Sequence, residues 1–171
     1  MIKISLIVED NGQQIFLEAL LKRLVFSEFG QLPKIIIEKP GHGTGGAGAV
    51  KTALEKRLKD LKKSRPGAPD LILAAIDANC RGYVKRRDEI EKITIKSEYR
   101  ELVALAIPDP HIERWLLLDS KAFKAVVGKG CQAPDYKCKK DVYKEKLRDA
   151  VRDAGRRPIL GGLEHAADIV N

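Results

Sequence analysis

The sequence predicts an α/β protein with a largely parallel sheet and helices on both of its faces. Short apolar segments typical of strands alternate four times with segments that have helical periodicity. The segment "LILAAI" (71–76) is apolar without alternation, as expected for a strand buried on both faces. Because no internal repeat or linker interrupts the 171 residues, we expect a single domain (1–171) with its core in about 1–127.

The first half of the chain contains two strand–helix units. The first strand is expected at residues 3–8, and the helix after it repeats apolar side chains at helical spacing. These side chains are Leu17, Leu20, Leu21 and Leu24. The β-branched segment "LPKIIIEKP" predicts a second strand that ends at Pro40, and a glycine-rich loop follows. The second helix then has one apolar face, formed by Val50, Leu54, Leu58 and Leu61.

The second half of the chain continues the same alternation and then weakens. After the strand at 71–76, "GYVKRRDEIEKIT" predicts a more polar helix, "ELVALAI" a fourth strand, and "HIERWLLLDSKAFKAVV" (111–127) a fourth helix. Residues 128–171 are expected to form a basic, helical C-terminal extension, with one helix at 142–154 and a short final helix. The predicted architecture is therefore a Rossmann-like sheet followed by this extension.

Composition limits the possible partners and compartments. The formal net charge of +8 favours polyanionic partners, with nucleic acid first and an acidic protein or a membrane surface second. No apolar run reaches the roughly 20 residues that a bilayer-spanning helix needs, and the N-terminus lacks the features of a signal peptide. We therefore expect a cytoplasmic protein that does not enter the membrane, with its three cysteines reduced.

Carboxylates follow three of the four predicted strands. Glu9 follows the first strand, Asp77 the third, and the segment from Asp109 to Glu113 the fourth. Parallel strands end at one edge of a sheet, so these acids converge if the three strands are neighbours. Clustered carboxylates repel one another, and a bound Mg²⁺ ion, which prefers oxygen ligands, would neutralise their charge. The alternative is that each acid caps a helix or makes a turn.

Three segments carry a resemblance to a known family: "SLIVEDNGQQIFLEALL", "LILAAIDAN" and "IPDPHIERWLLLD". Over about residues 2–120 the chain resembles a Toprim-like domain, the module shared by topoisomerases, primases and overcoming-lysogenization-defect nucleases. It is most similar to small stand-alone Toprim-related proteins of prokaryotes. The resemblance implies a Mg²⁺- or Mn²⁺-dependent nuclease or related phosphodiester-acting enzyme in a defence or DNA-processing system.

The resemblance also assigns roles to residues. Glu9 matches the first glutamate of the family, a metal ligand or general acid/base, and Glu113 matches a later glutamate. The two positions of the DxD motif fall on Asp77, a metal ligand, and on Asn79. Three positions depart from the family pattern: Asp10 replaces a glycine, Asn79 an aspartate and His111 a glutamate. An alternative is therefore a catalytically degenerate module that binds nucleic acid or a partner ATPase.

Two further features bear on phosphate binding. The segment "GHGTGG" matches a dinucleotide fingerprint, but it follows the second strand rather than the first, which favours a loop that enters a helix over a NAD site. A weaker functional interpretation is that backbone N–H groups near Gly43 and Thr44 hold a phosphate. Lys85, Arg86 and Arg87 follow Asp77 and are expected to contact a phosphate backbone.

Overall fold

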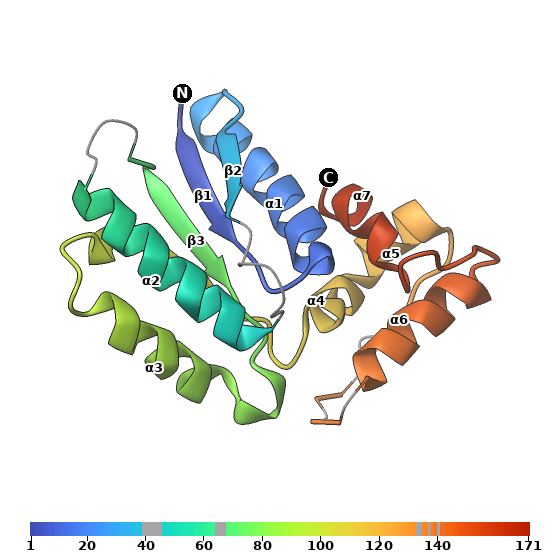
Figure 1. The fold of residues 1–171 in the computed structure, drawn as a ribbon. Coiled ribbons are helices and arrows are strands. Elements are labelled where there is room, and N and C mark those ends of the chain that lie inside the picture. Colours follow the sequence, from blue (N-terminus) through green and yellow to red (C-terminus); the bar gives the residue numbers. More distant parts are fainter. Residues whose placement is uncertain (39–45, 64–67, 133–134, 137, 140) are drawn as a thin grey trace.

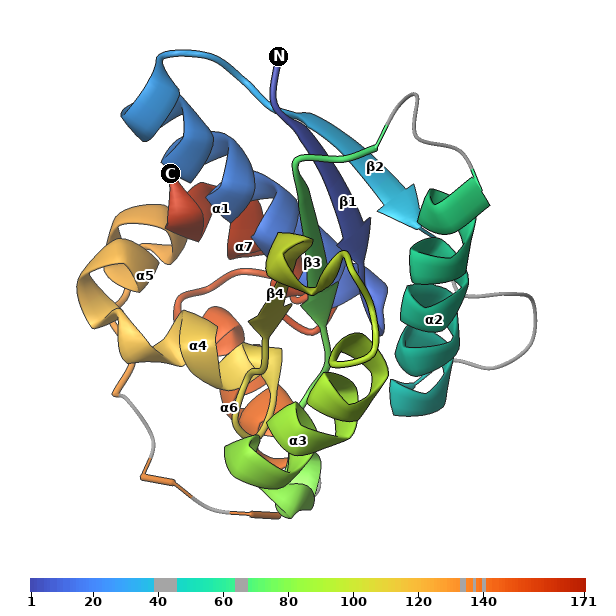
Figure 2. The same cartoon turned by 90° about the vertical axis from the view of Figure 1, so that its left-hand side faces the viewer.

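Four parallel strands form the centre of the computed structural model (Figures 1 and 2). The structure describes the chain except for residues 39–45, 64–67, 133, 134, 137 and 140. The strands are β1 (Lys3–Ile7), β2 (Lys34–Glu38), β3 (Leu71–Ala75) and β4 (Val103–Ala106). Their order in the sheet is β2-β1-β3-β4, and every neighbouring pair is parallel. This arrangement confirms the predicted α/β class and makes β1, β3 and β4 successive neighbours.

One face of the sheet is covered by α1 (Asn11–Phe29). The side chain of Asp10 caps this helix by accepting a hydrogen bond from the N–H of Gln13 at 2.9 Å. The helix ends at Gly30, whose φ of 65° is a left-handed conformation that favours glycine. The apolar side chains buried between α1 and the strands are Ile4, Leu6, Val8, Leu17, Leu21, Val25, Leu73, Ala75 and Ala106.

The opposite face is covered by α2 (Ala47–Lys63) and α3 (Tyr83–Thr94), which lie on the other side of the sheet from α1 in Figure 1. The residues buried beneath them include those predicted for the apolar face of α2. They are Ile7, Val50, Leu54, Leu58, Leu61, Ile72, Ala74, Ile76, Ala78, Ile90 and Ile107. Helices therefore cover both faces, as predicted.

The segment predicted as one helix at 111–127 forms two helices, α4 (Ile112–Leu118) and α5 (Ser120–Val127). The break lies at Asp119, whose φ of −100° and ψ of 84° depart from helical values. The Asp119 carboxylate accepts hydrogen bonds from the N–H groups of Lys121 at 3.1 Å and Ala122 at 2.9 Å. This carboxylate caps a new helix start, which explains why the prediction of a continuous helix was wrong.

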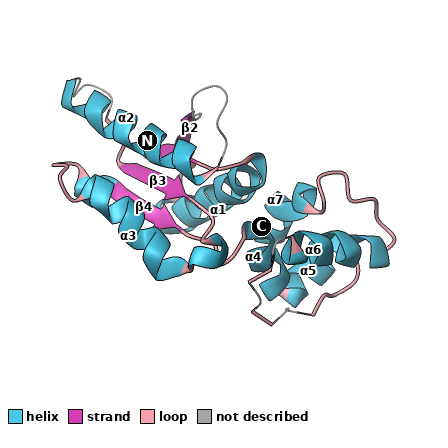
Figure 3. Ribbon diagram, turned by 60° about the horizontal axis from the view of Figure 1, so that its bottom comes forward, coloured by secondary structure: helices cyan, strands magenta, loops and turns pink. Residues whose placement is uncertain are grey.

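The C-terminal helices are α6 (Val142–Asp153) and α7 (Ala166–Val170), and they share a third core with α4 and α5. Buried in this core are Leu116, Leu117, Phe123, Val127, Tyr143, Leu147, Val151, Ala166 and Ile169. Figures 1 and 2 both show α7 beside α1, and Figure 3 shows α4 to α7 gathered on one side of the sheet. The predicted extension is therefore packed against the rest of the chain.

The structure corrects the prediction of three reduced cysteines. Cys80 and Cys138 form a disulfide between residues 58 positions apart, with their Cα atoms 5.4 Å from each other. Cys131 is free, and its Sγ donates to the carbonyl of Leu117 at 3.6 Å. Spacing along the sequence does not reveal this pairing, because it depends on how the C-terminal region folds back. Within the described ranges, none of the helices combines the length and the apolar character needed to cross a membrane.

Candidate functional site

The carboxyl ends of β1 and β3 bring Glu9 and Asp77 together. The backbone N–H of Asp77 donates to Oε2 of Glu9 at 3.1 Å. Asp77 is buried, with 7% of its surface exposed, whereas Glu9 is only partly buried. The two acids are 68 positions apart and meet because adjacent parallel strands end at the same edge. This part of the predicted convergence is confirmed.

Gln13, which the sequence reasoning missed, links these two positions. Its side chain is fully buried in the first turn of α1. Its Nε2 donates to Oδ1 of Asp77 at 2.8 Å, and its Oε1 accepts from the N–H of Glu9 at 2.9 Å. The only signal in the sequence is a polar residue four positions after Glu9, which one turn of helix brings back towards the strand end.

The segment between β4 and α4 adds His111 and Glu113. Nδ1 of His111 lies 3.2 Å from Oδ2 of Asp77, so both carboxylate oxygens of Asp77 have a hydrogen-bonding partner. Glu113 lies in the first turn of α4 and is only 3% exposed. Its Oε2 is buried without a hydrogen-bond partner in the described part of the chain. The third predicted acid thus points into the protein with one oxygen unsatisfied.

Asn79 lies in the turn that follows Asp77 and has a φ of 50°. Its backbone N–H donates to the carbonyl of Pro110 at 2.9 Å, which ties the turn after β3 to the segment after β4. Its side-chain Nδ2 donates to the carbonyl of Asp77 at 3.3 Å. The structure therefore keeps Asn79 beside Asp77 but directs its amide N–H towards the backbone.

Burial and neighbouring charges shift the pKa values of three groups at the site. Burial raises the pKa of Glu9, and the neighbouring Asp77 charge adds to the increase. Burial also raises the pKa of Glu113, with the positive charge of Lys144 acting in the opposite direction. The hydrogen bond to Asp77 raises the pKa of the His111 imidazole. A cation placed among these groups would favour the ionised carboxylates and offset the effect of their burial.

Arg86 has a structural role that differs from the predicted one. It is 4% exposed, and its Nε donates to the carbonyl of Asp77 at 3.1 Å while Nη1 bonds Oε2 of Glu89 at 2.9 Å. These interior contacts do not support a phosphate contact for Arg86. Lys85 is exposed, and Arg87 is partly exposed and paired with Asp88. Of the three basic residues, Lys85 is thus the most accessible to a polyanion.

The predicted phosphate-binding residues of the glycine loop, Gly43 and Thr44, lie outside the described residues. The described end of this loop, Gly46, has a φ of 88° and precedes the start of α2. A Cβ atom on Gly46 would lie 3.7 Å from Oε1 of Glu9. The start of α2 is therefore part of the same edge of the sheet as the acidic residues.

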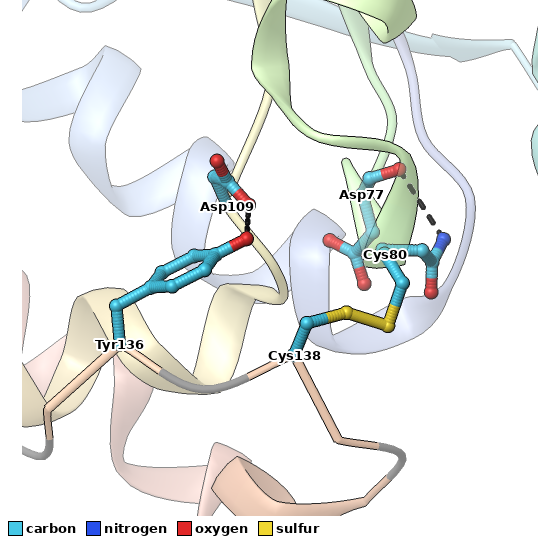
Figure 4. Close-up of a disulfide and its surroundings, with 6 residues drawn as sticks. Asp77, Cys80, Asp109, Tyr136 and Cys138 are labelled. Carbon is cyan, nitrogen blue, oxygen red and sulfur yellow. Dashed lines mark hydrogen bonds between the residues drawn. A yellow bond between two sulfur atoms is a disulfide. The ribbon is translucent and has the colours of Figure 1, made fainter.

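Two residues of the C-terminal region, Tyr136 and Cys138, lie beside Asp109 and Cys80 (Figure 4). The disulfide attaches Cys138 to Cys80, which is three residues after Asp77. The hydroxyl of Tyr136 donates to Oδ1 of Asp109 at 3.1 Å, and the guanidinium carbon of Arg114 lies 5.6 Å from the centre of the Tyr136 ring. These contacts attach Cys138 to the turn after β3 and Tyr136 to the segment after β4.

Comparisons with protein-family models, curated proteins and solved structures give no match for this chain. The resemblance to Toprim-like domains therefore rests on the sequence motifs alone and remains a prediction. Among the described side chains, no group of three or more His, Cys, Asp or Glu residues is already arranged to hold a metal ion. Glu9 and Asp77 nevertheless meet at one edge of the sheet, and Gln13 and His111 hold the oxygens of Asp77.

Proposed function

We propose that this chain is a divalent-metal-dependent nuclease, or a related phosphodiester-acting enzyme of the Toprim type, that uses Mg²⁺ or Mn²⁺. One observation carries the proposal: the buried, unpartnered Oε2 of Glu113, which interacts electrostatically with Asp77, whose N–H in turn bonds Glu9. A buried acceptor without a partner is costly, and a bound cation with its water shell removes that cost.

Carboxylates are the ligands that a hard cation prefers, although the described side chains are not already arranged around one. Glu9, Asp77 and Glu113 would hold the ion, because Mg²⁺ and Mn²⁺ prefer carboxylate oxygens and are usually bound by one or two of them together with substrate phosphates. When bound, the ion would activate a water molecule and stabilise the leaving oxygen of a phosphodiester. The protein's own contribution is to fix the orientation of Asp77 through the hydrogen bonds from Gln13 and His111.

The basic surface supports a polyanionic substrate. The net charge is +8, and Lys144 acts electrostatically on both Glu113 and His111, so an exposed cation stands close to the site. Lys85 is also exposed and lies in the first turn of α3, shortly after Asp77. Such cations attract a nucleic-acid backbone and position it without reading its sequence.

The second candidate is a module without catalytic activity that binds nucleic acid or a partner ATPase. The observation that favours it is that both oxygens of Asp77 accept hydrogen bonds inside the protein. Asn79 and His111, which replace family carboxylates, also reduce the negative charge available for a cation. The two candidates differ in whether a metal ion binds at the acidic group.

Metal binding is tested by thermal unfolding with and without Mg²⁺ or Mn²⁺. A ligand that binds only the folded state raises the unfolding temperature. We expect this increase in the wild type, and its loss in Asp77→Ala and in Glu113→Gln. Asp60→Asn, which changes an exposed carboxylate in the last turn of α2, serves as the matched control and should keep the increase. A wild type without any increase at millimolar metal would favour the second candidate.

Catalysis is tested with supercoiled plasmid, single-stranded DNA and RNA in the presence of Mn²⁺ or Mg²⁺. We expect metal-dependent cleavage that is lost in Glu9→Ala and kept in Asp60→Asn. Cleavage that persists in Glu9→Ala would show a contaminating nuclease or a different site. Salt-dependent binding of nucleic acid without cleavage by the wild type would instead support the non-catalytic module.

A further inference from the structure

The strand β2 forms one edge of the sheet, and its outer side has no strand partner among the described residues. Its sequence, "KIIIE", places three isoleucines between a lysine and a glutamate. Ile36 at the centre is 37% exposed, although it is a large apolar side chain. An exposed edge strand of β-branched residues is a template for pairing with another strand.

The hydrogen bonds to β1 determine which groups of β2 point outwards. The N–H of Lys34 donates to the carbonyl of Ile2 at 2.8 Å, so Lys34 directs its backbone groups towards β1. Backbone groups alternate in direction along a strand, and the parallel register continues through Glu38. The backbone N–H and C=O groups of Ile35 and Ile37 therefore face the open edge.

We propose that β2 of one copy pairs in antiparallel fashion with β2 of a second copy, about a two-fold axis at Ile36, to form a homodimer. In this register Ile35 exchanges both of its outward hydrogen bonds with Ile37 of the second copy, and Ile37 does the same with Ile35. Ile36 then faces its own symmetry mate. Residues opposite each other without mutual hydrogen bonds have the closest side chains, so the two isoleucines make direct contact.

The charges at the ends of β2 are complementary in the same register. Lys34 lies opposite Glu38 of the second copy, and this pair occurs twice because of the symmetry. Lys34 is exposed and has no ion pair among the described residues. Glu38 is held in place by the hydroxyl of Ser5 at 2.9 Å and by Nε of Arg57 at 3.3 Å. Opposite charges that face each other across strands stabilise the pairing, whereas like charges would oppose it.

Two further observations favour this edge and a partner of the same kind. Phe29, the last residue of α1, and Leu32, two residues before β2, are 63% and 62% exposed, so additional apolar surface lies in the segment leading into the strand. The other edge strand, β4, contains only "VALA" and is soon followed by Pro108, which has no N–H to donate. Self-pairing of β4 would place no opposite charges together. The proposal does not depend on the nuclease function.

The first test measures the mass of the full chain in solution by light scattering coupled to size-exclusion chromatography. We expect the mass to rise from 19.0 kDa towards twice that value as the concentration increases. Ile36→Lys should keep the chain monomeric, because it places two like charges at the symmetry axis. Val84→Lys, which changes a 57% exposed apolar residue on α3, is the matched control and should still dimerise. A wild type that stays monomeric at high micromolar concentration would overturn the proposal.

The second test fixes the register. In a Cys131→Ser background, Ile36→Cys should form an intermolecular disulfide under mild oxidation, because each residue 36 faces its own symmetry mate. Val84→Cys should not form one beyond the background of random collisions. Circular dichroism checks that each variant is folded. A dimer by mass that gives no cross-link through residue 36 would show that another surface is used, and this outcome also overturns the proposal.

Discussion

The sheet layer (β1 to β4 with α1 to α3) and the C-terminal helices (α4 to α7) form their cores in different ways. In the sheet layer, successive residues of one strand serve opposite faces, with Leu6 packing beneath α1 and Ile7 beneath α2 and α3. In the C-terminal region, side chains such as Phe123 and Leu147 come from separate helices and pack against one another. The first core follows from local alternation of strands and helices, whereas the second requires elements to meet across the segment between α5 and α6.

The candidate site lies where the two regions meet. Glu9 and Asp77 belong to strand ends of the sheet layer, while Glu113 belongs to α4, whose Leu116 and Leu117 are part of the C-terminal core. The disulfide adds a covalent link between the regions beside Asp77. If the two regions unfold as one cooperative unit, the geometry of the site depends on the stability of both. The predictions below test this dependence.

The largest expected effect is on the C-terminal core. Phe123→Ala removes a fully buried aromatic side chain and should lower the free energy of unfolding by about 3–5 kcal/mol. Because α7 packs on α1 and α4 packs on α6, we expect one cooperative transition in urea followed by circular dichroism and by Trp115 fluorescence.

Phe26→Ala is the control for this prediction, because Phe26 is 58% exposed on α1 and should cost much less. Two separate transitions, in which the sheet layer stays folded after the C-terminal helices unfold, would show that the regions are independent. In that case the meeting of Glu9 and Asp77 would not depend on the C-terminal helices.

The covalent link between the regions gives the next largest effect. Replacing both Cys80 and Cys138 by serine should lower the free energy of unfolding by about 2–4 kcal/mol, because the disulfide restricts a long loop in the unfolded chain. Urea unfolding of oxidised and reduced wild type should show a similar difference. Cys131→Ser is the control and should respond to reduction as the wild type does. An equal stability of the oxidised and reduced forms would contradict the prediction.

The contrast between the regions also explains how well the sequence predicted the fold. All four strands and the helices that cover the sheet could be predicted, because short apolar or β-branched segments alternate with segments of helical periodicity. The helix predicted at 111–127 was wrong at Asp119, since an aspartate inside an apolar pattern fits either an exposed helix face or a cap. The packing of α6 and α7 could not be predicted from their own patterns.

The contacts of the candidate site also include some that the sequence predicts and some that it does not. That Glu9 and Asp77 meet follows from a parallel sheet and could be predicted before their distance was known. Gln13 and the contact of His111 with Asp77 depend on the rotation of helices relative to the strands, which local patterns do not fix. Arg86 was misassigned because a basic residue next to a site has the same sequence signature whether it faces solvent or the interior.

A smaller effect is expected at Gln13, which belongs wholly to the sheet layer. Gln13→Ala leaves Oδ1 of Asp77 and the N–H of Glu9 without their partner and should lower the free energy of unfolding by about 1–3 kcal/mol. The metal-dependent increase in unfolding temperature should also shrink, since Asp77 loses one of the groups that orient it. Thermal unfolding with and without Mn²⁺ measures both effects.

Gln14→Ala is the neighbouring control, because the side chain of Gln14 donates to Glu18 within α1. It should leave the metal response unchanged. A Gln13→Ala variant with wild-type stability and wild-type metal response would show that the link between Glu9 and Asp77 has no role in holding the site.

The smallest effect is expected at Glu89, which links α2 and α3 of the sheet layer through its contacts with Lys51 and Arg86. Hydrogen bonds from Lys51 and Arg81 lower the pKa of Glu89 from 4.5 to about 2. Because the folded-state pKa is the lower one, the ionised carboxylate stabilises the fold above pH 4.5, and this contribution is lost as the pH falls from 4.5 towards 2. Glu89→Gln should cost on the order of 1 kcal/mol at pH 7. In urea titrations the gap to wild type should narrow below pH 4.5, whereas Glu55→Gln, an exposed change on α2, should show no such gap. A gap that stays constant down to pH 3 would mean that Glu89 stabilises α2 and α3 by packing rather than by its charge.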